Sequence, residues 1–240
     1  MELPQNDNQQ ERMDACCAMA GLGGFFLLQF ILPVMVLLFN IRGLPRLLLL
    51  QVPMHAGMIV LAVWCAKKYC PGRPVPEVLS LRRTERFSYG KTFLRFLEMS
   101  LLILALNFLV EAVCQWLKWD LPEQILVRQA QQGSTGEFLA IMLPAILLAP
   151  VSEELLFRGA LFRFFRTLVP GWQAMILSAL IFALFHWNIR FFLPLFGMAL
   201  MLQLVYQESG TLRGSILLHM LNNLTTALFL LWMRLSGPPL

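Results

Sequence analysis

The stretch "FLAIMLPAILLAPVSEELLFRGALF", residues 138–162, is an apolar run interrupted by two glutamates and an arginine. A bilayer core of about 30 Å is crossed by about 20 apolar residues in a helix. Backbone polar groups in lipid must be satisfied internally, so a run of this length predicts a transmembrane helix. Charges inside such a helix are costly unless they face a partner or a cavity, which makes Glu153, Glu154 and Arg158 candidates for function.

The rest of the chain has the same apolar character. Hydrophobic residues make up 58% of the sequence and charged residues 14%, with a mean hydropathy of +0.66, whereas soluble domains contain roughly 25% charged residues. We therefore expect an integral, multi-pass membrane protein in a lipid bilayer, the inner or plasma membrane if the source is a prokaryote. The net charge of +5 is small and no nucleic-acid motif is present, so nucleic acid is not an expected partner.

Hydropathy divides the chain into long apolar segments. We expect an all-α fold, a polytopic transmembrane helical bundle with about seven to eight membrane helices. The apolar segments are 18–39, 45–66, 93–117, 136–168, 171–189, 191–207 and 214–234. The expected parts are a polar N-terminal segment, 1–17, the N-terminal transmembrane helices, 18–135, and a transmembrane core that carries the polar motifs, 136–234.

A basic loop, residues 67–95, sets the expected orientation. It contains Lys67, Lys68, Arg73, Arg82, Arg83, Arg86, Lys91 and Arg95. Because cytoplasmic loops are enriched in Lys and Arg, we expect this loop on the cytoplasmic side. The segment 136–168 then reaches the same side near Arg163.

The first polar cluster is Glu153, Glu154 and Arg158, written E-E-x-x-x-R. Glu154 and Arg158 are four residues apart, so they share a helix face and can form an ion pair. Glu153 points about 100° away from Glu154, which leaves it as a free carboxylate. Pro150 cannot donate a backbone hydrogen bond, so we expect it to kink or open the helix there. A self-satisfied ion pair would need no function, but it leaves Glu153 without a partner.

Two more polar clusters lie in later segments. Phe182 and His186 are four residues apart, as are His219 and Asn223, so each pair shares a helix face. A buried histidine can also be a packing residue, and an asparagine in a span can simply bond a neighbouring helix. The remaining histidine, His55, has no polar partner at helical spacing, and we interpret it as structural.

A count of helix rises puts these side chains at a common depth. If the cytoplasmic boundary lies near Arg163, Glu153 is about 15 Å deep at 1.5 Å per residue. The same count gives about 9–15 Å for His186, His219 and Asn223. Arg190 then falls near mid-membrane, so we expect residues 187–194 to form an irregular turn that lines a water-filled cavity.

Glutamate, histidine and asparagine at one depth can hydrolyse a peptide bond. A carboxylate can take a proton from water, and a neighbouring histidine can hold that water. A histidine N–H and an asparagine amide one helical turn apart can stabilise the oxyanion that develops. The sequence has no H-E-x-x-H zinc helix and no G-x-S-x-G nucleophile. A cysteine nucleophile paired with His186 or His219 is an open alternative.

The three motifs, E-E-x-x-x-R, F-x-x-x-H and H-x-x-x-N in this order, resemble the CAAX protease and bacteriocin-processing family. The stretches "APVSEELLFRG" and "YQESGTLRGSILLHMLNN" are also similar to that family, which includes the type II CAAX prenyl endopeptidases. The resemblance covers residues 136–234. It implies an all-helical membrane endopeptidase, whose prenyl-protein members remove the last three residues after a lipidated cysteine.

The resemblance also implies a role for each motif residue. Glu153 and His186 would activate water, and His219 and Asn223 would form the oxyanion site. The positioning residues would be Glu154, Arg158 and Phe182. We expect no cofactor, and zinc bound by a His₂Glu set from these residues is the alternative.

The implied substrate is a membrane-associated or lipidated protein or peptide, cut near its C-terminus. Two alternatives belong to other classes of protein. One is a noncatalytic membrane scaffold or bacteriocin immunity factor with the same fold. The other is a proton-coupled transporter, which normally shows repeated halves that this sequence lacks.

Overall fold

The computed structural model describes residues 5–120 and 125–236, and this part of the chain is helical without strands. The helices are α1 (Gln5–Leu38), α2 (Gly43–Tyr69), α3 (Val75–Val78), α4 (Tyr89–Leu117), α5 (Ile125–Gln132), α6 (Thr135–Leu156), the π-helical turn η1 (Phe157–Leu161), α7 (Phe162–Leu168), α8 (Gly171–Leu184), α9 (Ile189–Ser209) and α10 (Leu212–Ser236). The predicted all-α fold is confirmed. Residues 1–4 of the predicted polar segment and residues 121–124 lie outside the described residues.

Six helical segments in the described ranges are long and apolar enough to cross a membrane. They are Asn8–Leu38, Gly43–Tyr69, Tyr89–Leu117, Thr135–Leu168, Ile189–Ser209 and Leu212–Ser236. The expected span at 171–189 is shorter than predicted, because α8 has 14 residues. A helix of that length is about 21 Å long, less than a hydrocarbon core of about 30 Å. Within the described ranges, the protein is thus a helical bundle with six helices long enough to span a membrane and one short apolar helix.

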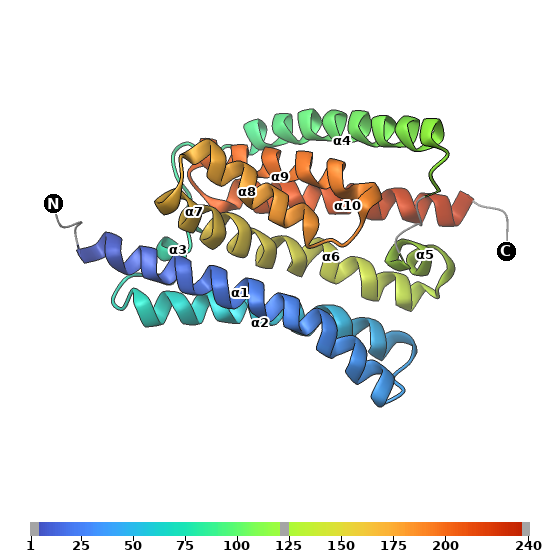
Figure 1. The fold of residues 1–240 in the computed structure, drawn as a ribbon, viewed down its shortest axis with the longest axis horizontal. Helices are drawn as coiled ribbons and strands as arrows, with labels where there is room; N and C mark the ends of the chain where they lie inside the picture. The colour runs from blue at the N-terminus through green and yellow to red at the C-terminus, as the bar shows by residue number, and fades with distance from the viewer. Residues whose placement is uncertain (1–4, 121–124, 237–240) are drawn as a thin grey trace.

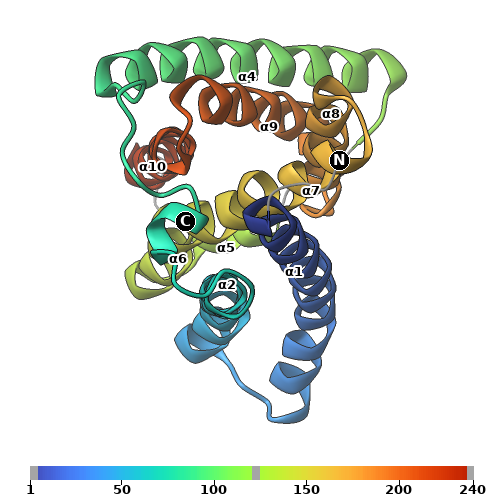
Figure 2. The same cartoon turned by 90° about the vertical axis from the view of Figure 1, so that its left-hand side faces the viewer.

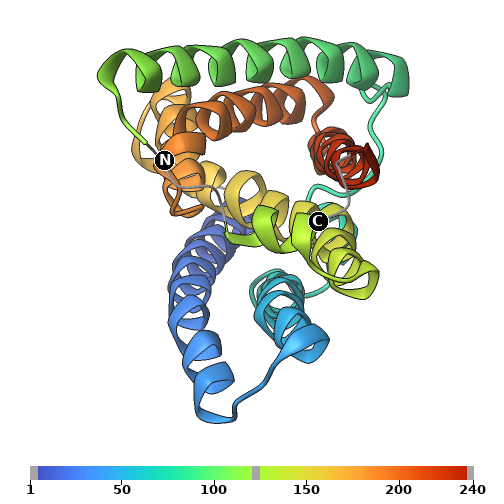
Figure 3. The same ribbon diagram turned by 90° about the vertical axis from the view of Figure 1, so that its right-hand side faces the viewer.

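The helices are arranged in successive layers. Figure 1 shows α1 and α2 as a hairpin along one side of the molecule and α4 along the opposite side. α6 lies between them and packs against α2 and α10, while α9 packs against α8, α10 and α4. The end views in Figures 2 and 3 show the same order, from the α1–α2 hairpin through α6 to α9 and α4. α6 is therefore the central helix of the bundle.

The outer surface of α4 is apolar and open. Its side chains Leu101, Phe108 and Trp116 are 69%, 74% and 81% exposed. Soluble monomers rarely expose contiguous apolar surface of this kind, whereas a helix in contact with lipid normally does. The exposure pattern agrees with the membrane setting inferred from composition.

At one end of the bundle, α1, α7 and the basic loop form a polar network, here called the end network. Arg163 pairs with Asp14 of α1 at 2.7 Å and donates to the Val78 carbonyl and the Ser80 hydroxyl. The backbone N–H of Leu212 donates to the Ser80 carbonyl at 2.8 Å. These bonds put the basic loop and Arg163 at the same end, as the topology argument predicted. The segment predicted as polar, 1–17, is part of helix α1 from Gln5 onward.

The turn between α8 and α9 places Arg190 at the start of α9, where it can reach α4. Trp187 has a left-handed backbone with φ of 49°, and Asn188 caps α9 by accepting from the backbone N–H of Arg190. Arg190 forms an ion pair with Glu111 of α4 at 2.7 Å. Both residues line a cavity of about 330 Å³. The irregular turn predicted at 187–194 is right only for 187–188: the turn spans 185–188, and residues 189–194, including Pro194, are helical in α9.

Candidate active site

The two glutamates lie at the end of α6, immediately before the π-helical turn. The predicted opening at Pro150 is wrong, because α6 continues through Pro144 and Pro150 to Leu156. The irregularity comes at η1, where the N–H of Phe162 bonds to the Phe157 carbonyl five residues earlier. Ser178 of α8 also donates to that carbonyl, at 3.0 Å. The partner on α8 thus stabilises the wider turn, and such turns often occur at functional sites.

Glu154 and Arg158 form the ion pair that their spacing predicted. Arg158 Nη1 lies 2.9 Å from Glu154 Oε1, and both side chains are fully buried. The second arm of Arg158 donates to the Ala199 carbonyl of α9 at 2.9 Å, and its guanidinium lies 4.8 Å from the Phe182 ring centre. Arg158 therefore ties α6 to α9 and α8, and its charge is matched at the site itself.

His219 of α10 connects the two glutamates. Its Nδ1 lies 3.1 Å from Glu154 Oε1, and its Nε2 lies 3.9 Å from Glu153 Oε2. A carboxylate paired with arginine only accepts, so the hydrogen of the first contact belongs to Nδ1. A neutral His219 consequently presents a bare Nε2 toward Glu153, whereas the imidazolium form presents an Nε2–H.

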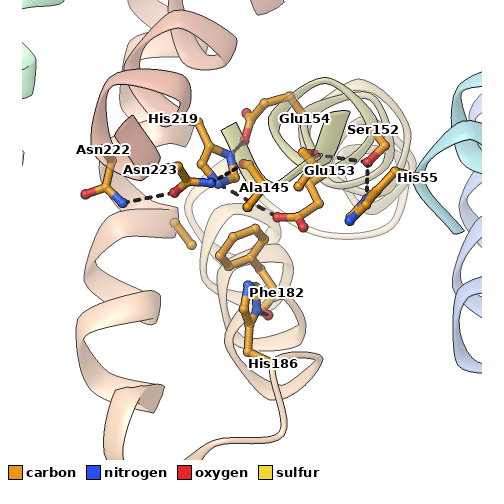
Figure 4. A network of polar contacts seen from close by, with 12 residues as sticks. His55, Ala145, Ser152, Glu153, Glu154, Phe182, His186, His219, Asn222 and Asn223 are labelled. Atoms are coloured by element: carbon orange, nitrogen blue, oxygen red, sulfur yellow. Dashed lines mark hydrogen bonds and ion pairs between the residues drawn. The ribbon is translucent and has the colours of Figure 1, made fainter. Parts of the chain in front are cut away.

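Glu153 differs from every other member of this cluster. Its side chain is buried, and its Oε2 has no hydrogen-bond partner. The Nε2 of His219 lies 3.9 Å from this oxygen, beyond hydrogen-bond distance. Figure 4 shows the carboxylate below His219, directed toward the space beside Phe182. Buried polar groups are normally bonded. Glu154 Oε2 also has no partner, but Glu154 Oε1 is bonded to Arg158 and His219, whereas Glu153 makes no hydrogen bond within the described part of the chain.

The other predicted residues lie at the edge of the cluster. His186 uses Nδ1 to bond the Phe182 carbonyl at 2.8 Å, and the Phe182 ring packs 4.7 Å from the imidazole between ring centres. Asn223 donates to the Ala145 carbonyl at 2.8 Å and keeps a second amide hydrogen. In Figure 4, Phe182 separates His186 from Glu153. The structure therefore joins Glu153, Glu154, Arg158 and His219, and it places His186 and Asn223 beside them.

The structure also adds a residue that sequence reasoning set aside. His55 of α2 bonds through Nδ1 to the Ser152 hydroxyl at 2.8 Å, and its side chain is buried. Ser152 is the residue before Glu153. His55 has no polar partner at helical spacing, as the sequence indicated, but it has one 97 residues away on another helix. A search for all buried histidines, without regard to spacing, would have retained it.

The donor set does not fit a zinc centre. A His₂Glu site needs its three side chains to converge on one point. Among the described residues no group of three His, Cys, Asp or Glu side chains does so. Glu153 and His219 approach each other, but His186 is turned toward the carbonyl of its own helix.

The helices that carry this site match a known protein family. Residues 135–225 match the family described as Type II CAAX prenyl endopeptidase Rce1-like, while no curated protein and no solved structure matches the chain. The matched segment runs from α6 into α10 and contains all seven residues of the three motifs. The match confirms the resemblance seen in the sequence over these helices, and the apolar helices fit an integral multi-pass membrane protein.

Proposed function

We propose that this chain is an intramembrane endopeptidase in which Glu153 activates water to hydrolyse a peptide bond. The observation that carries the proposal is the buried, unpartnered Oε2 of Glu153 beside a cluster whose other charges are paired. A purely structural carboxylate at this position would be expected to have a partner. The Rce1-like match over the same helices supports peptide hydrolysis as the reaction.

The reaction needs one general acid–base group. Glu153 takes a proton from water while the water oxygen bonds to the peptide carbonyl carbon, and the carbonyl oxygen becomes an oxyanion. The C–N bond then breaks, and Glu153 returns the proton to the leaving nitrogen. The products are a carboxylic acid and an amine, and Glu153 is again a carboxylate.

Two donors next to Glu153 suit the oxyanion. Asn223 is held through Ala145 and retains one amide hydrogen. His219 donates from Nε2 in its imidazolium form, and the Glu154 carboxylate at Nδ1 stabilises that charge. His186 lies on the other side of Phe182, where it can hold water that approaches Glu153. This assignment keeps the roles that the motifs imply and adds a condition on the charge of His219.

The proposed substrate is a membrane-associated protein cut near its C-terminus. The name of the matching family supports a prenylated cysteine as the recognition element. The central position of α6 requires substrate to reach the site from within the bundle or between helices. A noncatalytic scaffold with this fold is the alternative, and it assigns no use to the unpartnered carboxylate.

The test uses purified full-length protein in detergent or liposomes. The probe is a peptide ending in farnesylcysteine followed by three aliphatic residues, and the same peptide without the farnesyl group is run in parallel. Mass spectrometry follows loss of the last three residues. Glu153→Gln should reduce kcat by about 10²–10⁴-fold or more without loss of folded protein, because it removes the base and keeps the volume.

The matched control is Glu85→Gln, an exposed glutamate in the basic loop, which should cleave like the wild type. Wild-type turnover in Glu153→Gln would overturn the mechanism. If the wild type cleaves neither peptide, and cells with and without the protein contain the same C-terminal peptides, the scaffold alternative is supported instead.

A further inference from the structure

His55 comes from a part of the chain that lies outside the family match, yet it reaches the candidate site. The match covers residues 135–225, whereas His55 is on α2. α2 packs extensively against α6, the helix that carries the two glutamates. His55 is 5% exposed and has the Ser152 hydroxyl as its hydrogen-bond partner. A buried histidine bonded next to Glu153 requires an explanation.

The bond to Ser152 fixes the hydrogens of His55. The Ser152 hydroxyl donates its hydrogen to the Ala149 carbonyl at 3.0 Å, within its own helix. A hydroxyl has one hydrogen, so toward His55 it can only accept. The hydrogen of the 2.8 Å contact therefore belongs to Nδ1 of His55. In the neutral ring, Nε2 is then an acceptor.

The imidazole of His55 is turned toward Glu153. Figure 4 shows the two side chains next to each other, near enough for an electrostatic interaction when both are charged. The other charged groups around Glu153 are His219 of α10 and Arg158 of η1. His55 is thus the group that α2 contributes to the surroundings of this carboxylate.

We propose that His55 is a positioning residue that orients Glu153 and stabilises its protonated form through Nε2. The inference rests on the proposed function of Glu153. When Glu153 has taken a proton from water, it becomes a donor, and the bare Nε2 of His55 can accept from it directly or through one water. This interaction is weaker before the proton moves, so it favours the transition state over the ground state.

Two substitutions separate this role from simple packing. His55→Asn keeps a donor near Nδ1 for Ser152 but leaves nothing toward Glu153. His55→Gln places an amide near the position of Nε2. With the farnesylated peptide, His55→Asn should lower kcat about 10–100-fold, as loss of orienting partners does elsewhere, with KM changed less than about two-fold. His55→Gln should recover part of kcat.

The control is Met58→Leu, a conservative change of a buried residue one turn further along α2, which should keep wild-type kcat. Wild-type kcat in His55→Asn would overturn the proposal and leave His55 as a packing link between α2 and α6. If Glu153→Gln is inactive in the same assay, that result affects His55 alone and not the proposed function.

A spectroscopic test needs neither substrate nor the His55 variants. The chain has three histidines, so the ¹⁵N spectrum of imidazole-labelled full-length protein contains few signals. We expect the Nδ1–H tautomer at His55, a shift of its Nε2 resonance in Glu153→Gln, and a shift of its Nδ1 resonance in Ser152→Ala. Glu85→Gln should leave all three histidines unchanged. Identical His55 resonances in the wild type and Glu153→Gln would overturn the proposal whether or not the protein cleaves a peptide.

Discussion

The end network and the candidate site both hold charges inside the bundle, and they differ in how these charges are satisfied. In the end network, Arg163 makes an ion pair with Asp14 and two further hydrogen bonds, and Gln10 also donates to Asp14. In the site, Glu154 and Arg158 form an ion pair at 2.9 Å, whereas Glu153 makes no hydrogen bond and lies 3.9 Å from His219 Nε2.

This difference separates the paired side chains, which hold helices together, from the Glu153 carboxylate, which is available for chemistry. The bonds of Arg163 hold α7 to α1 and the basic loop, so the end network joins elements that are distant in sequence. Arg158 does the same for α6, α8 and α9. Glu153 has only the 3.9 Å contact with His219 Nε2 and no hydrogen bond, so less of the free energy that its burial costs is recovered. Substitutions in the two regions should therefore change different measured quantities.

The largest effect on stability is expected for Arg158→Met. It leaves the Glu154 carboxylate buried without its guanidinium and the Ala199 carbonyl without a donor. Breaking a buried ion pair in this way typically costs about 3–5 kcal/mol. Unfolding of the purified protein, followed by helical circular dichroism in detergent, measures the change. The double variant Glu154→Leu/Arg158→Met should recover part of the stability, since it removes both partners.

Full stability in Arg158→Met, with loss of turnover alone, would move Arg158 from the structural charges to the chemistry. Arg158 would then contact the substrate, and only Glu154 would remain as a structural charge in the site.

Asn223→Ala should produce the next largest effect, on activity. Loss of one oxyanion donor typically lowers kcat about 10²–10³-fold. Steady-state cleavage of the farnesylated peptide gives kcat and KM separately, and we expect the loss in kcat. Thr226→Val is the matched control, because its hydroxyl bonds only the Asn222 carbonyl of the same helix. An Asn223→Ala enzyme with unchanged kcat and lower stability would make Asn223 a link to Ala145 and nothing more.

Asp14→Asn should have a smaller effect, confined to stability. The amide keeps an oxygen for Arg163 but loses the charge, and a hydrogen bond to a charged group is worth about 1.5–3 kcal/mol. Thermal unfolding should shift downward while kcat of the folded enzyme stays at the wild-type value. A fall in kcat at full stability would show that the end network acts on the site, which would break the proposed division.

Short-range features of this protein could be predicted from the sequence, and contacts across helices could not. Hydropathy located the long spans, and the i, i+4 rule predicted the pair of Glu154 and Arg158. The depth count brought His219 to the level of the glutamates, which the 3.1 Å contact with Glu154 confirms. These predictions succeed because helix geometry relates sequence distance directly to position.

The predictions that failed concern contacts between helices, which local spacing does not determine. The bond of His55 to Ser152 depends on how α2 docks on α6, and no local spacing encodes that. The wide turn at η1 depends on Ser178 of α8, so Pro150 was an incomplete guide to where the helix changes. Helix α8 ends at Leu184 because the chain turns there before α9, which Asn188 caps. The apolar sequence continues past this turn, so hydropathy did not reveal where α8 ends.

Metal removal should have the smallest effect, no loss of activity. A zinc enzyme of this composition would need Glu153, His186 and His219 as ligands. In the structure His219 directs Nδ1 to Glu154, and His186 directs Nδ1 to the Phe182 carbonyl with the Phe182 ring against the imidazole. Bringing His186 to the other two would require repacking Phe182, which is completely buried and also contacts Arg158.

We therefore expect purified, active protein to retain its kcat after exhaustive treatment with several chelators of different affinity, with less than stoichiometric zinc by elemental analysis. The comparison of the two regions gives the reason. Glu153 Oε2 has no hydrogen-bond partner in the protein, as a general base that must bind water requires, and His219 is already bonded to Glu154 through Nδ1. Stoichiometric zinc whose removal stops cleavage, and whose return restores it, would make His219 a ligand instead of an oxyanion donor. Such a result would also predict that Asn223→Ala keeps the metal while His219→Gln loses it, which the same elemental analysis measures.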